Sequence, residues 1–328
     1  PGPSSSDVAL AVGPSSAPPP GLPGEDVRTT STRTHARSGR HRHAVAAVAF
    51  LVPTVALIIV LRIMPTVTAG GDAMRSGLPG SLAPPEFVGL EVFGRLFQSE
   101  SFWQSVRQTL VFNVLVNPIQ VLIALLLAVL LTRNLPASGL WRTLIFIPAA
   151  VPLAGSTIIW GIALRPDGPV NGLLELVGVS PQPFFTSPDQ VIASMIILAS
   201  WIGIGYWMVF LIAGLNDISP VYYEAASIDG AGPVRTFFSI TLPMLKRPLL
   251  FVLVADTVAN FVLFAPVHIL TGGGPEKQSN FLMYDVYNRG YQLSDPYTSS
   301  AELLVLLALM IVIVVVQFRL LGSGDGGE

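Results

Sequence analysis

Cysteine is absent from the 328 residues of this sequence, which excludes disulfide bonds, thiolate catalysis and cysteine metal sites. Lysine is scarce: it occurs only at Lys246 and Lys277, and neither follows a glycine, so the Gly-Lys pair of a phosphate-binding P-loop is missing. Charged residues make up 12% of the chain, against about 25% in soluble domains, and the formal net charge is −2. An ordinary soluble domain, a P-loop ATPase and a basic nucleic-acid-binding surface are therefore excluded.

Hydrophobic residues make up 51% of the sequence and gather in long runs. A helix needs about 20 predominantly apolar residues to cross the hydrocarbon core of a bilayer. The segments that meet this requirement are residues 44–66, 106–131, 142–164, 190–215, 247–270 and 300–321. The sequence therefore predicts an all-α membrane protein with six transmembrane helices.

Residues 1–43 differ from the rest of the chain, because they are rich in Pro, Ser, Gly, Thr and Arg and have few bulky apolar side chains. Such a segment cannot bury enough surface to offset the entropy cost of ordering, so it is predicted to be a disordered tail. Its histidines are interpreted as part of a solvated basic segment, and no metal site is predicted anywhere in the sequence. Residues 44–321 then form the transmembrane domain, and residues 322–328 form a short second tail.

The distribution of Lys and Arg predicts the orientation, because basic residues resist translocation across the membrane. The segments 1–43, 132–141 and 216–246 carry more of these residues than the segments on the opposite side, which are residues 67–105, 165–189 and 271–299. We therefore expect both termini and the loop between the fourth and fifth spans to lie in the cytoplasm. The sequence thus predicts a multi-pass protein of the inner or plasma membrane.

The loop between the fourth and fifth spans contains the stretch EAASIDGAGP, Glu224 to Pro233. Pro220 and Pro233 suit the first turns of two short helices, and Gly230 can adopt the left-handed conformation that ends the first one. Val221, Ala225 and Ile228 share one face of that helix by their spacing. Taken on its physical features alone, this stretch indicates an ordinary connection between two helices.

The residues from Tyr223 to Ala231, followed by Ile240 to Pro243, resemble the EAA loop of inner-membrane permease subunits of binding-protein-dependent ABC importers. The stretch LTGGGP, Leu270 to Pro275, is similar to a block found in the carbohydrate-uptake branch, which comprises the maltose and glycerol-phosphate type permeases. Weaker matches occur at Phe87–Leu90, Phe102–Trp103, Arg142–Thr143 and Gln317–Leu320. The resemblance extends over about residues 45 to 321.

This resemblance implies a division of labour between subunits. Two such permeases form the pore as a heterodimer, two copies of a cytoplasmic ATPase bind ATP and Mg, and an extracytoplasmic binding protein delivers the solute. The permease itself binds no cofactor and is not an enzyme. The coupling residues implied by the resemblance are Glu224 as the charged contact, Ala225, Ala226, Gly230 and Ala231 as small packing residues, and Asp229 as the residue that holds the turn.

A polar stripe in the fifth span is the candidate substrate path. Asp256, Asn260, Phe264 and His268 recur every four residues and would share one face of a continuous helix. Polar residues inside a membrane avoid lipid, so this face should point into the bundle or toward a water-filled path. The functional hypothesis is a sugar-contacting face, and the alternative is hydrogen bonding between helices. The stripe departs from the family pattern, which commonly has Phe-Asp where this chain has Phe264-Ala265.

The second span offers similar alternatives, since Asn113, Asn117 and Gln120 either line the pore or hold neighbouring helices. Several functions remain open at this point. The first is an ATP-driven importer of a sugar or oligosaccharide, and the second is the same machinery for a glycerophosphodiester, a polyamine or another small solute. An ion-coupled secondary transporter would use Asp256 as its ion site. A membrane scaffold would use the loop to bind a partner other than an ATPase.

Overall fold

The computed structural model describes residues 48–77, 84–133 and 136–322. The tail predicted for residues 1–43 lies outside the described residues, as do residues 323–328 of the second tail. The chain divides into two units, Pro1–Ile59 and Val60–Glu328. The described residues of the first unit are helical, and the fold described below is that of the second unit.

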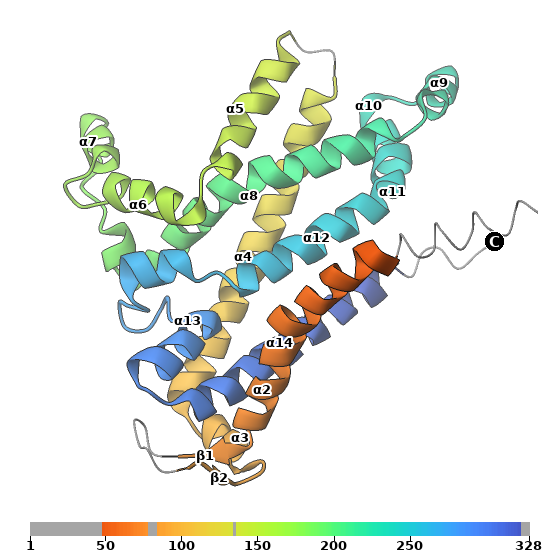
Figure 1. Cartoon of the computed structure of the whole chain (residues 1–328). Coiled ribbons are helices and arrows are strands. Elements are labelled where there is room, and N and C mark those ends of the chain that lie inside the picture. Colours follow the sequence, from red (N-terminus) through yellow and green to blue (C-terminus); the bar gives the residue numbers. More distant parts are fainter. Residues whose placement is uncertain (1–47, 78–83, 134–135, 323–328) are drawn as a thin grey trace, which may run out of the picture. The chain divides into compact units, whose positions relative to one another are not determined.

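Helices form most of the second unit (Figure 1). The long ones are α4 (Glu100–Leu131), α8 (Val191–Asn216), α12 (Lys246–Phe261) and α14 (Pro296–Gly322). The shorter ones are α2 (Met64–Asp72), α3 (Glu91–Phe97), α5 (Ser138–Ala150), α6 (Leu153–Ala163), α7 (Pro169–Leu176), α9 (Pro220–Ile228), α10 (Pro233–Thr236), α11 (Leu242–Met244) and α13 (Leu282–Tyr287). Short π-helices are η1 (Ile59–Ile63), η3 (Phe237–Thr241), η4 (Val267–Thr271) and η5 (Asn288–Gln292). A short 3₁₀ helix is η2 (Phe184–Thr186). The strands β1 (Arg75–Ser76) and β2 (Glu86–Phe87) pair antiparallel, with Arg75 opposite Phe87.

The described residues contain four helices long and apolar enough to cross a membrane: Val48–Asp72, α4, α8 and α14. Two further pairs of helices pass the same test only as bent units. One is α5 with α6, bent by 96°, and the other is Pro233–Met244 with α12, bent by 67°. The number of candidate spans is therefore four, or up to six if each bent pair is one span.

The third predicted span, residues 142–164, is not a single helix, because the chain turns sharply between Ala150 and Leu153. Pro152 lies at this turn and disfavours the helical conformation of the residue before it, and Val151 is accordingly extended. The fifth predicted span, residues 247–270, is also wrong as a continuous helix, since α12 ends at Phe261. Pro266 explains this ending, because it has no N–H to continue the helical hydrogen bonding.

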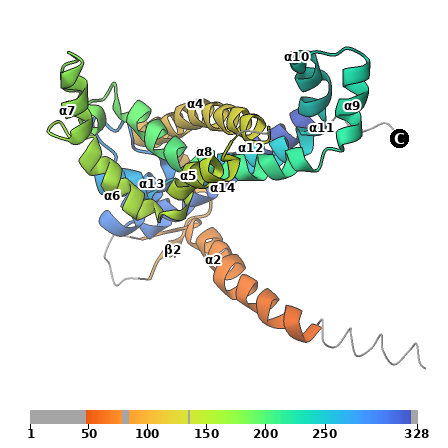
Figure 2. The ribbon, with the colours of Figure 1, turned by 90° about the horizontal axis from the view of Figure 1, so that it is seen from above.

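The core of the second unit lies between α4, α8 and α12, which contact one another. Near the middle of α8, α5 crosses it at Gly205, where a side chain would collide with the backbone carbonyl of Ile145. Figures 1 and 2 show α9 and α10 together at one end of α8, and α6 and α7 toward its other end. The loop with the EAA-like stretch and the TGGG turn before α13 thus lie at opposite ends of the bundle.

Candidate functional site

The loop between α8 and α12 folds as the predicted pair of short helices. Proline begins each helix, at Pro220 in α9 and Pro233 in α10. Gly230 has a φ of +69°, so it adopts the left-handed conformation that ends α9. The backbone N–H of Asp229 donates to Ala225 over 3.0 Å and closes the last turn of the helix. Next to it the N–H of Ala231 donates to the carbonyl of Ala226 over 2.9 Å, which fixes the hairpin between the two helices.

One side of this hairpin is apolar and exposed. The predicted face of Val221, Ala225 and Ile228 is turned outward, and Ile228 is 87% exposed. Ala226 is instead buried, so it packs within the hairpin rather than on its surface. Glu224 is exposed as well, and it forms no ion pair among the described residues. The hairpin therefore presents both apolar side chains and a free carboxylate.

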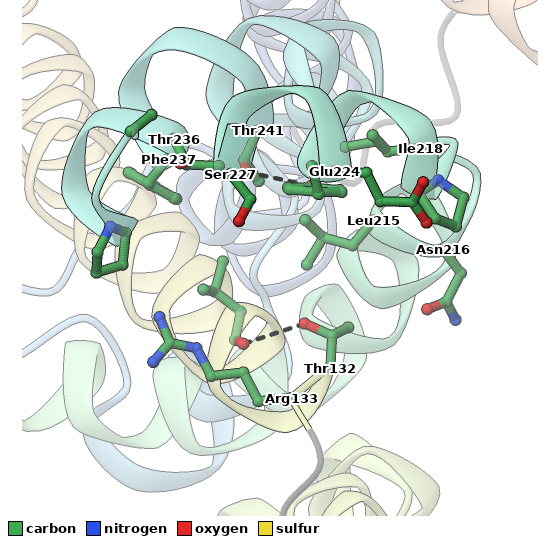
Figure 3. Close-up of a pocket in the computed structure, with 15 residues that line it drawn as sticks. Thr132, Arg133, Leu215, Asn216, Ile218, Glu224, Ser227, Thr236, Phe237 and Thr241 are labelled. Atoms are coloured by element: carbon green, nitrogen blue, oxygen red, sulfur yellow. Dashed lines mark hydrogen bonds between the residues drawn. The ribbon is translucent and has the colours of Figure 1, made fainter. Parts of the chain in front are cut away.

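A cavity of about 840 Å³ lies between this hairpin and the end of α4. Figure 3 shows Glu224 and Ser227 on the hairpin side of the cavity and Arg133 on the α4 side. Tyr223 and Thr241 line the cavity too, and a hydrogen bond of 3.2 Å joins their hydroxyl groups.

Asp256 and Asn260 lie one turn apart on α12 and are both buried in the bundle. The Asn260 amide donates to Asp256 Oδ1 over 3.1 Å, and the Trp207 indole N–H of α8 donates to the same oxygen over 2.6 Å. Asn260 also donates to Asn117 of α4 over 2.7 Å. Asp256 Oδ2 has no hydrogen-bond partner among the described residues. These contacts join three helices and leave one carboxylate oxygen without a donor.

The polar network continues toward α14. The Asn117 amide donates to Thr257 Oγ1 over 3.1 Å, and the Gln317 amide donates to the same hydroxyl over 2.8 Å. Gln120 accepts a longer bond of 3.3 Å from Asn260. The hydrogen-bonding alternative for the second-span amides is therefore confirmed for Asn117 and Gln120.

Phe264 and His268 do not continue the stripe of Asp256 and Asn260, because α12 ends before them. Their rings stack on each other with centroids 5.0 Å apart. Tyr287 meets both rings edge-on, with centroids 4.8 Å and 5.0 Å away. The predicted four-residue stripe is thus two sites, a buried polar one and an aromatic one that leaves His268 exposed.

The LTGGGP stretch forms a turn. Gly272 and Gly273 have φ values of +56° and +85°, and a side chain at Gly273 would come within 2.9 Å of the Tyr284 ring. The Ser279 hydroxyl donates to the carbonyl of Gly274 over 2.6 Å. Glycine is required in this turn both by its conformation and by the close approach of Tyr284.

A buried charged cluster lies beside this turn. Arg289 Nε is 2.7 Å from Glu302 Oε2 and 3.2 Å from Asp285 Oδ2. Glu302 is fully buried, and Asp285 also accepts a hydrogen bond of 3.2 Å from Asn280. One guanidinium group therefore lies beside two buried carboxyl groups.

Several of these side-chain contacts were not predicted from the sequence. Trp207 was evident only as an aromatic residue of the fourth span, and Gln317 only as part of a weak family match. Arg289 and Glu302 are separated by a loop and a helix start, so no local spacing links them. The positions of Glu302 and Gln317 inside a predicted span are signals that indicate buried polar contacts. Among the described residues, no group of three His, Asp or Glu side chains could hold a metal ion.

Comparison with known proteins decides the family. Residues 120–323 match the model of the binding-protein-dependent transport system inner membrane component. The chain belongs to this family. The permease is 37% identical over 237 residues to the sn-glycerol-3-phosphate transport system permease protein UgpA of Yersinia pestis, covering 71% of this chain and 80% of the relative. It is 35% identical over 235 residues to the protein of the same name from Agrobacterium fabrum, with the same coverage.

The fold of the permease is also that of a solved transporter. It matches a chain of a bacterial ABC transporter involved in the import of the acidic polysaccharide alginate, with a TM-score of 0.72 and 21% identity. The match covers 88% of the permease and 99% of the other chain. These findings confirm the resemblance to ABC importer permeases of the carbohydrate-uptake branch. The protein is a multi-pass transport component.

Proposed function

We propose that this permease forms half of the pore of an ATP-driven importer for a sugar or oligosaccharide, and that it couples the motion of a separate ATPase to alternating access. A second permease completes the pore, and an extracytoplasmic binding protein delivers the solute. Both termini lie in the cytoplasm, as the Lys and Arg distribution indicates. The observation that carries the proposal is the exposed hairpin of α9 and α10, which presents Ile228 and Glu224 at one end of the bundle.

The hairpin residues take different roles in this proposal. Glu224 makes the charged contact with the ATPase, because its carboxylate is exposed and unpaired among the described residues. Ala225 and Gly230 allow close approach of the partner, whereas Ala226 and Ala231 hold the hairpin together through their backbone hydrogen bond. Asp229 closes the last turn of α9. No cofactor is bound by the permease, since ATP and Mg belong to the ATPase, and it catalyses no reaction itself.

The substrate path includes Asp256, Asn260, Phe264 and His268 in the two groups described above. Asp256 Oδ2 has no partner among the described residues, so it can accept a hydrogen bond from a solute hydroxyl. Phe264 and His268 with Tyr287 offer aromatic surface of the kind that packs against a sugar ring.

Purification of the tagged permease from its native membrane tests the proposal. We expect an ATPase with a P-loop and a second six-span permease to be identified with it by mass spectrometry. Reconstituted into liposomes, the complex should accumulate solute when ATP is supplied, without an ion gradient. Solute uptake driven by an ion gradient in the absence of any ATPase would instead establish a secondary transporter, and the proposal would be wrong.

Glycerol phosphate and its diesters are the second candidate solutes. The observation that favours them is the name of relatives that are 37% identical to this chain, the sn-glycerol-3-phosphate permeases. Calorimetric titration of the partner binding protein with maltose, glucose, sn-glycerol 3-phosphate and glycerophosphocholine separates the two candidates. Binding of the phosphate esters alone would replace the sugar in the proposal and leave the coupling mechanism unchanged.

Replacing Asp256 by asparagine is expected to raise the KM of uptake about tenfold, because a hydrogen bond to a charged group contributes about 1.5 kcal/mol. Asparagine can keep its side-chain oxygen toward Trp207, so the thermal unfolding temperature should change little. Asp256→Leu serves as the contrast, since it removes two hydrogen bonds and should lower that temperature as well. If Asp256→Asn transports with an unaltered KM, Asp256 has only a packing role.

A further inference from the structure

The α9–α10 hairpin is hydrogen-bonded to the bundle at Thr241, whereas a cavity lies between it and the end of α4. We propose that Tyr223 is a positioning residue: its hydroxyl bond to Thr241 makes α9 move together with α11 and α12, while the cavity beside it lets the hairpin move relative to α4. The proposal rests on the proposed docking of the ATPase to this hairpin. It goes further by naming the contact and the span that receive the displacement.

The first observation is the contrast between Tyr223 and its neighbours on α9. Tyr223 packs against an apolar cluster to which α4, α8 and α12 all contribute, with Leu245 among its members. Its hydroxyl lies 3.2 Å from Thr241 Oγ1, and Thr241 is 6% exposed. By contrast Tyr222 and Glu224, which precede and follow it, are both exposed. Tyr223 is therefore the side chain through which α9 forms a hydrogen bond to a later element of the described chain.

The second observation is the position of Thr241. It is the last residue of η3, and α11 follows it directly. The chain then bends at Leu245, which is fully buried, and continues as α12. A side chain at Gly214 of α8 would come within 2.7 Å of Pro248 and 3.1 Å of Leu245, so α8 supports this bend at close range. A displacement of Thr241 thus enters the first turn of α12, the helix that carries Asp256.

The third observation is the separation of the hairpin from α4. The cavity of about 840 Å³ has Thr132 and Arg133 on its α4 side. Among the described residues, no hydrogen bond or ion pair crosses it from α9 to α4. Arg133 and Glu224 carry opposite charges and still form no ion pair with each other. Close packing transmits displacement in proteins, and a cavity interrupts it. The hairpin is therefore hydrogen-bonded to the segment that leads into the fifth span, whereas a cavity separates much of it from the end of the second span.

Spin-label distances in the assembled complex test this directly, because the permease has no cysteine to remove. One pair of labels is placed at Tyr222→Cys and Met244→Cys, and another at Tyr222→Cys and Leu130→Cys. Each pair is measured without nucleotide and after trapping with ATP and vanadate, so no transported solute is needed. We expect the 222–244 distance to stay constant and the 222–130 distance to shift. A constant 222–130 distance with a shifting 222–244 distance would overturn the proposal.

The hydroxyl contact is tested by adding Tyr223→Phe to the 222–244 pair. We expect a broader and shifted distance distribution, and the same change with Thr241→Val. Thr241→Ser should restore the wild-type distribution because it retains the hydroxyl. Thr236→Val is the matched control, since among the described residues the Thr236 hydroxyl donates to the carbonyl of Gly232, directly before its own short helix.

The double variant Tyr223→Phe with Thr241→Val should show no greater change than either single variant, because both remove the same bond. An unchanged distribution in Tyr223→Phe would refute the tether. Failure of the proposed function gives a different result: the ATPase would not co-purify with the unsubstituted permease. Co-purification of the ATPase with every variant, checked in the same preparations, shows that only the internal contact has been altered.

Discussion

Replacing Arg289 by methionine is expected to lower the free energy of unfolding by about 3–5 kcal/mol, because removing one partner of a buried ion pair leaves uncompensated charge. Arg289 is the cation beside both Asp285 and Glu302, at 3.2 Å and 2.7 Å. Glu302 is fully buried, so water cannot take the place of the guanidinium. Thermal unfolding and SDS titration of the purified protein in detergent measure the loss.

An exposed ion pair of the same spacing provides the control. Arg95 lies 3.6 Å from Glu91, four residues away, and both side chains are more than half exposed. Arg95→Met should change the free energy of unfolding by at most about 1 kcal/mol, since exposed pairs contribute little. The triple variant Arg289→Met, Asp285→Asn and Glu302→Gln should recover much of the lost stability because it removes the carboxyl groups that the guanidinium accompanies. Equal losses from Arg289→Met and Arg95→Met would show that the buried cluster does not stabilise the fold.

Replacing Ile228 by aspartate is expected to weaken binding of the ATPase about a hundredfold. Ile228 is 87% exposed in the permease alone, and burying an isoleucine side chain contributes about 1.5–3 kcal/mol. Aspartate forfeits that contribution and must also be desolvated at the contact. Each 1.4 kcal/mol corresponds to about a factor of ten in affinity. Biolayer interferometry between the permease in nanodiscs and the purified ATPase measures the change.

Leu176→Asp is the matched control for this variant. Leu176 is 82% exposed on α7, toward the opposite end of α8 from the hairpin. We expect its substitution to leave ATPase affinity unchanged, because the proposed contact lies elsewhere. Similar losses in both variants would point to a general defect in the protein rather than to docking on α9.

Local features of the hairpin were predictable from the sequence. Pro220, Gly230 and Pro233 determine where each short helix starts or stops, and these effects depend on the backbone of a few residues. The shared face of Val221 and Ile228 on α9 followed from their helical spacing in the same way. Such features need no knowledge of distant contacts, and the structure confirms them.

The bends and the pairings were not predictable in the same way. The run 142–164 is predominantly apolar. Hydropathy indicates how long a span is but not whether it bends, so the 96° bend at Pro152 was not foreseen. The prediction of a polar stripe in the fifth span required a continuous helix, but the helix ends at Phe261. The bond between Trp207 and Asp256 joins residues 49 positions apart and depends on how α8 packs against α12. A single sequence contains no direct signal for such a contact.

The sharp elbow between α5 and α6 restricts what can surround this part of the molecule. A break in a helix leaves backbone amide and carbonyl groups outside the helical ladder, and acyl chains offer them no partner. The elbow around Val151 must therefore be sheltered by protein or reached by water, wherever it lies in the depth of the bilayer. Lipid cannot cover the surface of the permease at this elbow. We therefore expect a neighbouring subunit or a water-filled passage beside it.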